Sequence, residues 1–284
     1  MPDFPIVDGH LHLYDPAVLS FPWMKEVPAL DRPHLVREFD AAREGLEVEA
    51  AVFVEVDAAP GAHVAEARFI AALARNEPRI GAIVAHLPMD RGAETARDLE
   101  ALREIPLVRG IRHLIQGHRN EPGWALRPEF VSGVQGLAGT GLVFDICIYA
   151  EQLPDATELV ARCPKVQFVL DHLGKPDVRG GGFESWSRDV AALAQHPNVA
   201  CKISGLATEA DHATWREEEL VPYIDRAIEV FGFERVLFGG DWPVSTLATG
   251  YRRWVECVDR AVAGASEAER RQLFVGNAGR LYRF

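Results

Sequence analysis

The sequence contains no long hydrophobic run, no excess of positive charge and no start typical of a secreted protein. No apolar stretch approaches the ~20 residues that a membrane-spanning helix needs. The opening residues MPDFPIVDG lack the basic and apolar regions of a secretory signal. The formal net charge is −12, a sign that repels a nucleic-acid backbone. We therefore expect a cytoplasmic protein that binds neither a membrane nor nucleic acid.

The sequence also lacks several motifs that mark common catalytic and binding sites. Its four cysteines, at 147, 163, 201 and 257, form no C-x-x-C pair, which argues against a disulfide framework and against a zinc-thiolate site. No strand is followed by G-x-G-x-x-G or by a P-loop, which argues against an open doubly wound nucleotide-binding sheet. No G-x-S-x-G elbow is present, which argues against a serine esterase.

What the sequence does contain is eight short β-rich runs that recur at a spacing of roughly 33 residues. The runs are 5–13, 50–57, 80–88, 107–116, 142–149, 166–174, 198–207 and 235–243. Segments with helical apolar spacing lie between them, such as 62–77, 91–105, 150–163 and 218–232. Near-continuous apolar strands that alternate with helices predict a parallel sheet. Eight such units predict an α/β fold, a (β/α)8 TIM-like barrel that forms one domain over residues 1–284.

The first run contains the stretch VDGHLHLYDP, in which two histidines lie two residues apart. Successive side chains of a strand alternate between its faces, so His10 and His12 should point to one side and Leu11 and Leu13 to the other. Two hydrogen-bonded structural histidines would give the same pattern. The pair therefore predicts a convergence of imidazoles and does not by itself predict a catalytic site.

In a barrel of this type, polar side chains at the carboxyl ends of the strands share one pocket. The sharpest subset there is His10, His12, His172 and Asp241. Three neutral imidazoles and one carboxylate are suitable ligands for one zinc or manganese ion with an open position for water. Asp241 alone is also suited to act as a general base.

Other polar residues at these strand ends have structural interpretations. Arg112 and Lys202 are candidates for ion pairs inside the barrel, with Glu55 or Asp145 as partners. His113 and Asp171 fall out of phase with their inward-facing neighbours, which favours a helix-facing, hydrogen-bonded role at least as much as a catalytic one. Asp57 is expected to cap a loop. Burying so many ionisable groups at one barrel mouth is costly unless they are paired or used in function.

Three motifs together carry a resemblance to a known family: VDGHLHLYDP at the start, VLDHLGKP in the sixth run and VLFGGDWPVS in the eighth. They resemble the amidohydrolase superfamily and, within it, the fuconolactonase-like branch of sugar lactonases. The likeness covers essentially the whole chain. It implies a (β/α)8 barrel that hydrolyses a sugar-acid lactone, such as L-fuconolactone or L-rhamnonolactone. It also implies His10, His12, His172 and Asp241 as the catalytic and metal-site residues.

The chain departs from the two-metal members of that superfamily. Those members place a lysine or glutamate at the end of the fourth strand and a histidine at the end of the fifth, where this chain has RHLIQ and FDICIY. A binuclear centre cannot be assembled in that way. The resemblance is therefore compatible with a site that holds one divalent metal ion, zinc or manganese, and also with a metal-independent site.

The candidate residues and the resemblance lead to two hypotheses, one on the mechanism and one on the substrate pocket. Asp241 would take a proton from the attacking water and return it to the ring alkoxide, with His172 and Arg112 contacting the lactone carbonyl. Two long loops, 14–33 and 117–130, are expected to help build the pocket. The expected substrate contacts are Trp23, Lys25, Glu55, His86, Arg112, Gln116, Tyr149 and Trp242.

Two other functions are compatible with the same residues. One is a metal-dependent decarboxylase of the same barrel family, and the other is a barrel that binds sugar acids without turning them over. A small-molecule sugar lactone is the expected partner. The sequence leaves open which lactone is opened, the metal requirement and the oligomeric state.

Overall fold

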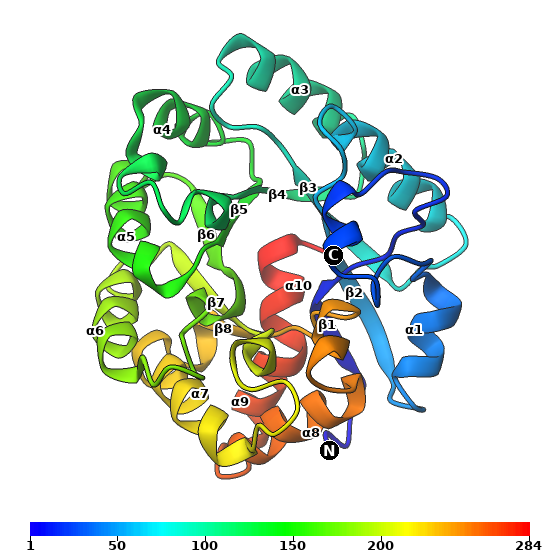
Figure 1. The fold of residues 1–284 in the computed structure, drawn as a ribbon, viewed down its shortest axis with the longest axis vertical. Helices are drawn as coiled ribbons and strands as arrows, with labels where there is room; N and C mark the ends of the chain where they lie inside the picture. The colour runs from blue at the N-terminus through cyan, green and yellow to red at the C-terminus, as the bar shows by residue number, and fades with distance from the viewer.

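Eight parallel strands form the centre of the molecule, and the computed structural model describes all of residues 1–284 (Figure 1). The strands pair in sequence order from β1 to β8. Their bounds are β1 Ile6–Leu11, β2 Val48–Val54, β3 Ile80–His86, β4 Val108–Leu114, β5 Val143–Cys147, β6 Gln167–Leu170, β7 Val199–Ile203 and β8 Val236–Phe238. All eight predicted strands are present, so the predicted (β/α)8 barrel is confirmed.

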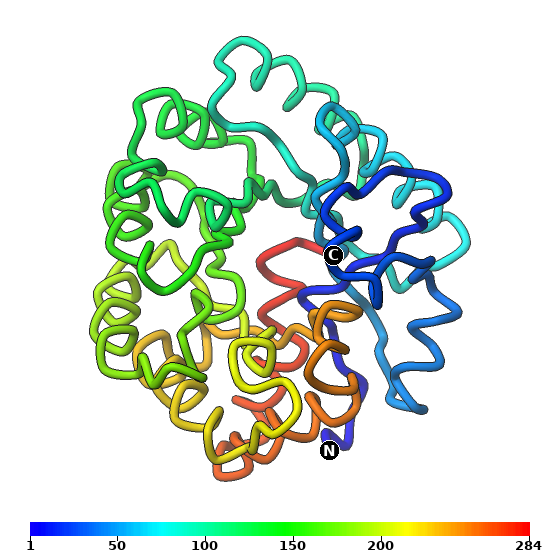
Figure 2. Tube along the Cα trace, in the orientation of Figure 1, coloured from blue at the N-terminus to red at the C-terminus, as the bar shows by residue number.

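One helix after each strand contributes to an outer ring, which Figure 2 shows as a continuous path around the barrel, and two further helices follow the last of these. Their bounds are α1 Val36–Ala42, α2 His63–Leu73, α3 Ala93–Arg103, α4 Pro128–Gln135, α5 Leu153–Arg162, α6 Phe183–Ala194, α7 Glu217–Phe231, α8 Tyr251–Ala261, α9 Glu267–Arg271 and α10 Asn277–Tyr282. The four helical segments predicted from apolar spacing correspond to α2, α3, α5 and α7. A cluster of 73 buried residues fills the space between this ring and the strands.

The barrel closes between the end of β1 and the residues that follow β8. The Asp241 N–H donates to the His10 carbonyl oxygen at 2.7 Å, and the His12 N–H donates to the Trp242 carbonyl oxygen at 2.8 Å. Gly9 makes this approach possible, because a Cβ atom at that position would lie 2.6 Å from the Phe238 carbonyl oxygen. The closure therefore brings the His-x-His segment and Asp241 side by side.

The last three strands are shorter than predicted. The predicted runs 166–174, 198–207 and 235–243 end as strands at Leu170, Ile203 and Phe238. The backbone then leaves the extended conformation, with positive φ angles at His172 (53°) and Asp241 (53°). Both candidate site residues consequently lie on turns that follow strands, and not within the strands themselves.

The C-terminal helix α10 lies within the ring of strands, where it is seen in Figure 1. Its residues Ala278, Leu281 and Tyr282 belong to the apolar cluster of the barrel interior, together with strand residues such as Val52 and Val169. The Tyr282 hydroxyl reaches the Asp145 carboxylate, 2.9 Å from each oxygen. The end of the chain therefore closes the barrel interior and contacts its buried charges, a contact that the sequence patterns did not predict.

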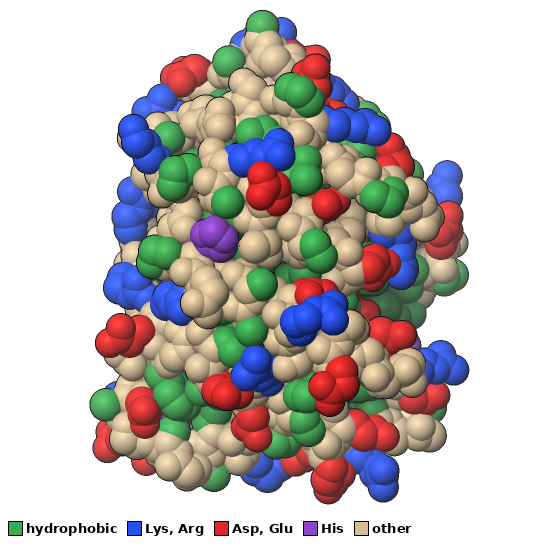
Figure 3. Space-filling view, turned by 90° about the vertical axis from the view of Figure 1, so that its left-hand side faces the viewer, with side chains coloured by type: hydrophobic (Ala, Val, Ile, Leu, Met, Phe, Trp, Pro, Cys, Tyr) green, Lys and Arg blue, Asp and Glu red, His purple; other side chains and the backbone are tan.

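The surface carries acidic and basic side chains interspersed, as the face in Figure 3 shows. The exposed large hydrophobic residues are Met1, Val18 and Phe284. None of the helices combines the length and the apolar character that crossing a bilayer requires.

The contact between α10 and Asp145 predicts a stability effect for Tyr282→Phe, which keeps the ring and removes the hydroxyl. We expect this change to lower the free energy of unfolding by about 2 kcal/mol, because the lost hydrogen bond has a charged acceptor. Tyr14→Phe is the matched control: its buried hydroxyl donates to the neutral Leu30 carbonyl at 3.0 Å and should cost about 1 kcal/mol. Urea unfolding measures both, and equal losses would contradict a charged role for the Tyr282 contact.

His34 provides a second prediction, on acid stability. Its ring is 3% exposed between the rings of Tyr14 and Trp242, and neither ring nitrogen has a hydrogen-bond partner within the chain. Burial lowers the pKa of His34 from 6.5 to about 4. As pH falls from 6.5 toward 4, the unfolded chain binds a proton at His34 before the folded chain does, so the free energy of unfolding decreases.

Replacing His34 with Phe should remove this part of the acid sensitivity. Between pH 7 and pH 4.5, the free energy of unfolding of wild type should fall by about 1–3 kcal/mol more than that of His34→Phe. Urea unfolding at both pH values measures the difference. Parallel pH profiles for the two proteins would show that His34 does not titrate on unfolding.

Candidate functional site

A cavity of about 280 Å³ opens at the carboxyl ends of the strands. Its walls come from strand ends and from the segments that follow them; the predicted loop 14–33 contributes Trp23, whereas no residue of the predicted loop 117–130 lines the cavity. The lining residues are His12, Trp23, Glu55, Val56, Asp57, Arg112, Leu114, Gln116, Cys147, His172, Lys175, Thr208, Asp241 and Val244. The cavity is where the fold brings polar side chains from distant parts of the sequence together.

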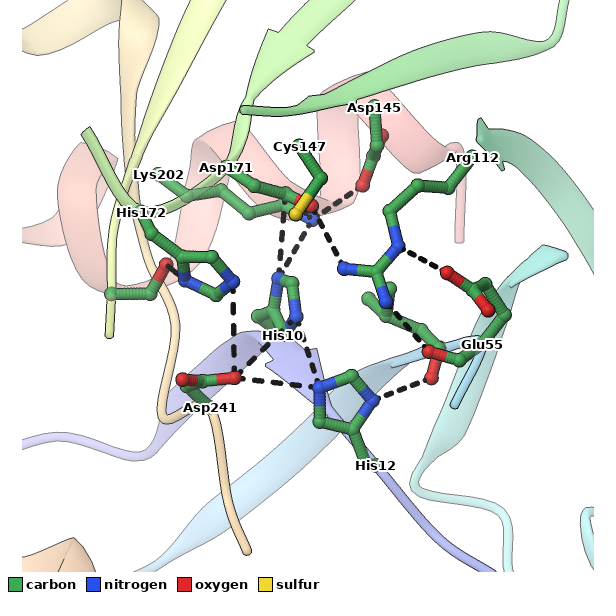
Figure 4. Close-up of polar contacts among 12 residues, drawn as sticks. His10, His12, Glu55, Arg112, Asp145, Cys147, Asp171, His172, Lys202 and Asp241 are labelled. Carbon is green, nitrogen blue, oxygen red and sulfur yellow. Dashed lines mark hydrogen bonds and ion pairs between the residues drawn. The ribbon is translucent and has the colours of Figure 1, made fainter. Parts of the chain in front are cut away.

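The two histidines of the first strand region point to the same side, as the alternation argument predicted. Their Nε2 atoms are 3.2 Å apart (Figure 4). The Nδ1 atom of His12 lies 2.8 Å from the Val54 carbonyl oxygen, which can only accept, so this nitrogen carries the proton. The Nε2 atom of His12 is thereby left with a free lone pair that faces the centre of the site.

Asp241 and His172 complete the cluster. The Asp241 Oδ1 atom is 3.4 Å from His12 Nε2, 3.6 Å from His10 Nε2 and 3.9 Å from His172 Nε2. Gly205 allows this packing: its φ is 62°, and a Cβ atom there would lie 2.6 Å from the Nδ1 atom of His172. The hydrogen-bond partner of that nitrogen is the Ser204 hydroxyl, at 2.9 Å.

The ionisation states in this cluster follow from burial. Burial lowers the pKa of His10 well below its usual value and that of His172 to about 4. Burial alone would raise the pKa of Asp241, but His172, His12 and His10 outweigh it and hold that pKa below its usual value. At neutral pH the cluster therefore presents the ionised Asp241 carboxylate to the neutral imidazoles of His10 and His172.

A chain of buried charges lies beside the histidines (Figure 4). Arg112 pairs with Glu55 at 2.6 Å and with Asp171 at 3.0 Å, while Lys202 pairs with Asp171 at 3.0 Å and with Asp145 at 2.5 Å. All five side chains are at most 5% exposed. The interpretation of Arg112 and Lys202 as ion-pair partners within the barrel is confirmed.

His10 joins this chain of charges to the cluster. Its Nδ1 atom lies 3.3 Å from Lys202 Nζ and 3.4 Å from Asp171 Oδ1. Lys202 Nζ also reaches that Asp171 oxygen, at 3.0 Å. With its proton on Nδ1, His10 would donate toward Asp171 and turn the Nε2 lone pair to the cluster, the arrangement usual for a histidine that binds a metal.

The donor set fits one divalent metal ion. Ligands held at ~2.0–2.1 Å around one tetrahedral ion lie about 3.3 Å apart, and the separations of 3.2, 3.4 and 3.6 Å among His10, His12 and Asp241 are close to this value. These three residues form one potential metal-binding group, and His10, Asp171 and His172 form a second. His172 is outside the first group, and its Nε2 atom lies 3.9 Å from Asp241 Oδ1.

Asp171 corrects one of the expectations from sequence. A helix-facing role was expected at least as much as a catalytic one, because His172 was assumed to face inward on a regular strand. Val169 lies in the barrel interior, so alternation along the strand also directs Asp171, two residues later, to the interior. The left-handed backbone at His172 then directs that side chain inward as well. His113, assigned to the same outer side, does lie outside the barrel, packed against Trp124 and Phe130.

Asp57 corrects a second expectation. It does not cap a loop with its side chain, which lines the cavity; only its backbone N–H is bonded, to Glu55 Oε2 at 2.7 Å. Burial, with the negative charge of Glu55, raises the pKa of Asp57 to about 6.

Four of the eight expected substrate contacts line the cavity: Trp23, Glu55, Arg112 and Gln116. The other four do not. Trp242 is buried against Phe39 and His34, because it follows Asp241 on the helix-facing side. Lys25 is exposed to solvent on the loop after β1.

Tyr149 and His86 also lie outside the cavity lining. The Tyr149 ring lies under the Arg119 guanidinium, 4.2 Å from ring centroid to carbon. His86 lies near the rings of His63 and His113, and its Nδ1 atom is buried without a partner. These two residues are at strand ends, as predicted, but their side chains pack beside the cavity walls.

Lys175 is the main cavity residue that sequence reasoning missed. Four successive residues, from His172 to Lys175, have positive φ angles of 53°, 56°, 73° and 48°. Only Gly174 among them adopts such angles without strain, and each of the others costs on the order of 1 kcal/mol. This left-handed turn directs both His172 and Lys175 into the cavity. The motif VLDHLGKP already contained the lysine, three residues after His172.

The family model described as amidohydrolase matches residues 7–284. The chain belongs to the amidohydrolase family. The resemblance drawn from the three sequence motifs is thereby confirmed. It extends across all eight strands and includes every residue of the cluster around Asp241.

Several relatives of this amidohydrolase carry functional names. The L-fucono-1,5-lactonase of Burkholderia multivorans is 31% identical over 97% of this chain and 95% of its own. The L-rhamnono-gamma-lactonase of Scheffersomyces stipitis is 28% identical over 72% of this chain and 69% of its own. A solved amidohydrolase from Burkholderia multivorans with bound zinc has a TM-score of 0.88 at 30% identity, and covers 99% of this chain and 100% of its own.

The ligand geometry predicts a graded loss of metal affinity. We expect the protein to bind one equivalent of Zn²⁺, and His172→Asn to weaken binding by more than the roughly 10–100-fold that loss of an outer partner causes. Ser204→Ala, which removes the partner of His172 Nδ1, should fall within that 10–100-fold range. Competition titration against a zinc indicator measures all three proteins.

The control is His196→Asn, a histidine ahead of β7 at the opposite end of the barrel, which should leave Zn²⁺ affinity unchanged. Equal Zn²⁺ affinity in wild type and His172→Asn would show that His172 is not a ligand.

Proposed function

We propose that this amidohydrolase opens a sugar-acid lactone by attack of water on the ring ester carbonyl. The observation that carries the proposal is the meeting of Asp241 with the Nε2 atoms of His10, His12 and His172 at the mouth of the barrel. An ionised carboxylate beside neutral imidazoles can hold a water molecule and accept its proton. The names of the relatives, a fuconolactonase and a rhamnonolactonase, support the same reaction.

In the proposed mechanism, Asp241 takes a proton as the water oxygen bonds to the carbonyl carbon. The tetrahedral intermediate then collapses, the ring C–O bond breaks, and Asp241 returns the proton to the departing alkoxide. One carboxylate thus serves both halves of the reaction, and the product is the open-chain acid. His172, whose Nε2 atom faces the same point, is a candidate contact for the carbonyl oxygen.

Arg112 is a weaker candidate for that contact than the sequence suggested. Its Nε, Nη1 and Nη2 atoms each donate already, to Glu55 Oε1, Asp171 Oδ2 and the Glu55 carbonyl. Only the second hydrogens of its two terminal nitrogens are left for a ligand. We therefore assign Arg112 to the cavity wall and to the positioning of Glu55 and Asp171.

A divalent ion, zinc or manganese, would be held by His10, His12, His172 and Asp241. When bound, such an ion supplies Lewis-acid stabilisation of developing negative charge and lowers the pKa of a bound water. The chain's own contribution is the orientation of the ligands, since Val54, Ser204 and the buried charges fix the three imidazole rings.

The cavity supports a neutral aldonolactone as substrate. Trp23, Val56, Leu114 and Val244 provide an apolar wall, while Gln116 and Thr208 offer hydrogen bonds to hydroxyl groups. The Arg112 charge is matched by Glu55 and Asp171, so the cavity has no arginine cluster for a dicarboxylate.

A panel of aldonolactones, assayed with a pH indicator, tests the proposal. We expect acid release with at least one six-carbon lactone, and a loss of about 10²–10⁴-fold in kcat for Asp241→Asn. Asp31→Asn, an exposed aspartate on the loop after β1, is the control and should retain wild-type kcat.

The result that would overturn the proposal is the absence of acid release across the panel. Carbon dioxide release from an unsaturated carboxylic acid would instead indicate a decarboxylase. Binding of sugar acids without any turnover would indicate a binding protein.

A further inference from the structure

The cavity contains one cation that forms no ion pair with a carboxylate. Of the lining residues, only Arg112 and Lys175 carry a permanent positive charge, and Arg112 is paired with Glu55 and Asp171. The Lys175 Nζ atom makes no ion pair: it donates to the neutral Gln116 Oε1 at 2.5 Å and lies 5.3 Å from the centroid of the Tyr149 ring. An unmatched charge in a cavity wall is suited to a ligand that is, or becomes, an anion.

The backbone fixes Lys175 beside the catalytic cluster. The Lys175 N–H donates to the His172 carbonyl oxygen at 2.8 Å, which closes the left-handed turn. Leu173 between them is fully buried, and Pro176 follows directly. The turn therefore holds His172 and Lys175 at its two ends as one unit.

The ammonium group of Lys175 is charged at neutral pH. Burial acts to lower its pKa, but the nearby Cys147 and Glu209 outweigh burial and hold the pKa above the usual value. An ammonium group has three N–H donors, of which Gln116 takes one. Donors therefore remain for a ligand in the cavity.

We propose that Lys175 is a catalytic residue whose Nζ donates a hydrogen bond to the carbonyl oxygen of the substrate and to the oxyanion that forms from it. This role rests on the proposed lactone hydrolysis. Water attack converts a neutral carbonyl into an oxyanion, so a fixed positive charge is worth more in the transition state than in the bound substrate. Lys175 transfers no proton, because Asp241 accepts the proton of the attacking water and returns it to the departing alkoxide.

The same contact predicts preference for the product acid over an uncharged analogue. After ring opening, the former carbonyl oxygen is one oxygen of a carboxylate, still facing Lys175. L-fuconate and L-fucitol share a carbon skeleton and differ in having a carboxylate or a CH₂OH group. Lys175 should distinguish these two compounds even without catalysis.

The experiment compares wild type with Lys175→Met, Lys175→Gln and Lys175→Arg by steady-state kinetics and by calorimetric titration with the two compounds. We expect the Met and Gln variants to lose about 10²–10³-fold in kcat, with KM for the lactone changed less than about tenfold. They should bind L-fuconate at least about tenfold more weakly and L-fucitol as wild type does. Lys175→Arg should recover part of both losses.

Lys165→Met is the matched control, because Lys165 is exposed just ahead of β6 whereas Lys175 follows the same strand. It should match wild type in every measurement. If Lys175→Met does not fold, Lys175→Gln provides the same comparison.

Two results with the uncharged variants would overturn the proposal. The first is a kcat within about threefold of wild type for the uncharged variants. The second is an equal loss of affinity for L-fuconate and L-fucitol, which would mean that Lys175 only shapes the cavity.

A wild-type protein that opens no lactone, yet binds L-fuconate through Lys175, would refute the proposed hydrolysis and retain the anion contact. A wild-type protein that does not distinguish the two compounds would refute the Lys175 contact whatever its activity.

Discussion

Five buried side chains of alternating charge cross the barrel interior from Glu55 through Arg112, Asp171 and Lys202 to Asp145, and the candidate site depends on them. Charges this deeply buried are stable only when each one is paired, so removing one partner leaves its neighbour uncompensated. The pairing fixes every side chain in the chain of charges. It thereby gives His10, which lies beside it, a rigid support (Figure 4).

His10 transmits this support to the site, because its Nδ1 atom lies between Lys202 and Asp171 while its Nε2 atom faces His12 and Asp241. The position of the proton on this ring decides whether Nε2 offers a lone pair or a hydrogen. The tyrosine near the C-terminus, Tyr282, takes part through Asp145, so both ends of the chain contribute to one network.

The periodicity of apolar residues predicted the fold correctly but predicted only part of the candidate site. Alternation within a strand correctly placed His10 and His12 together, because that segment stays extended. It assigned Asp171 to the wrong face, because the backbone after β6 turns left-handed and brings His172 inward out of phase. The same turn brings in Lys175, which no alternation rule could assign to the cavity. Tyr149 and Trp242 follow the ends of strands, as predicted, but their side chains pack against Arg119 and Phe39 and do not line the cavity.

The sequence alone determined the eight-fold alternation of strand and helix, because apolar spacing is a local property of each segment, and it supplied the three motifs that carry the family resemblance. Only the tertiary structure decided which charges pair, where the C-terminal helix lies and which lysine remains unmatched in the cavity. Pairing depends on distances between residues far apart in the chain, such as Tyr282 and Asp145, and these are set by closure of the barrel. Local patterns contain no information on those distances.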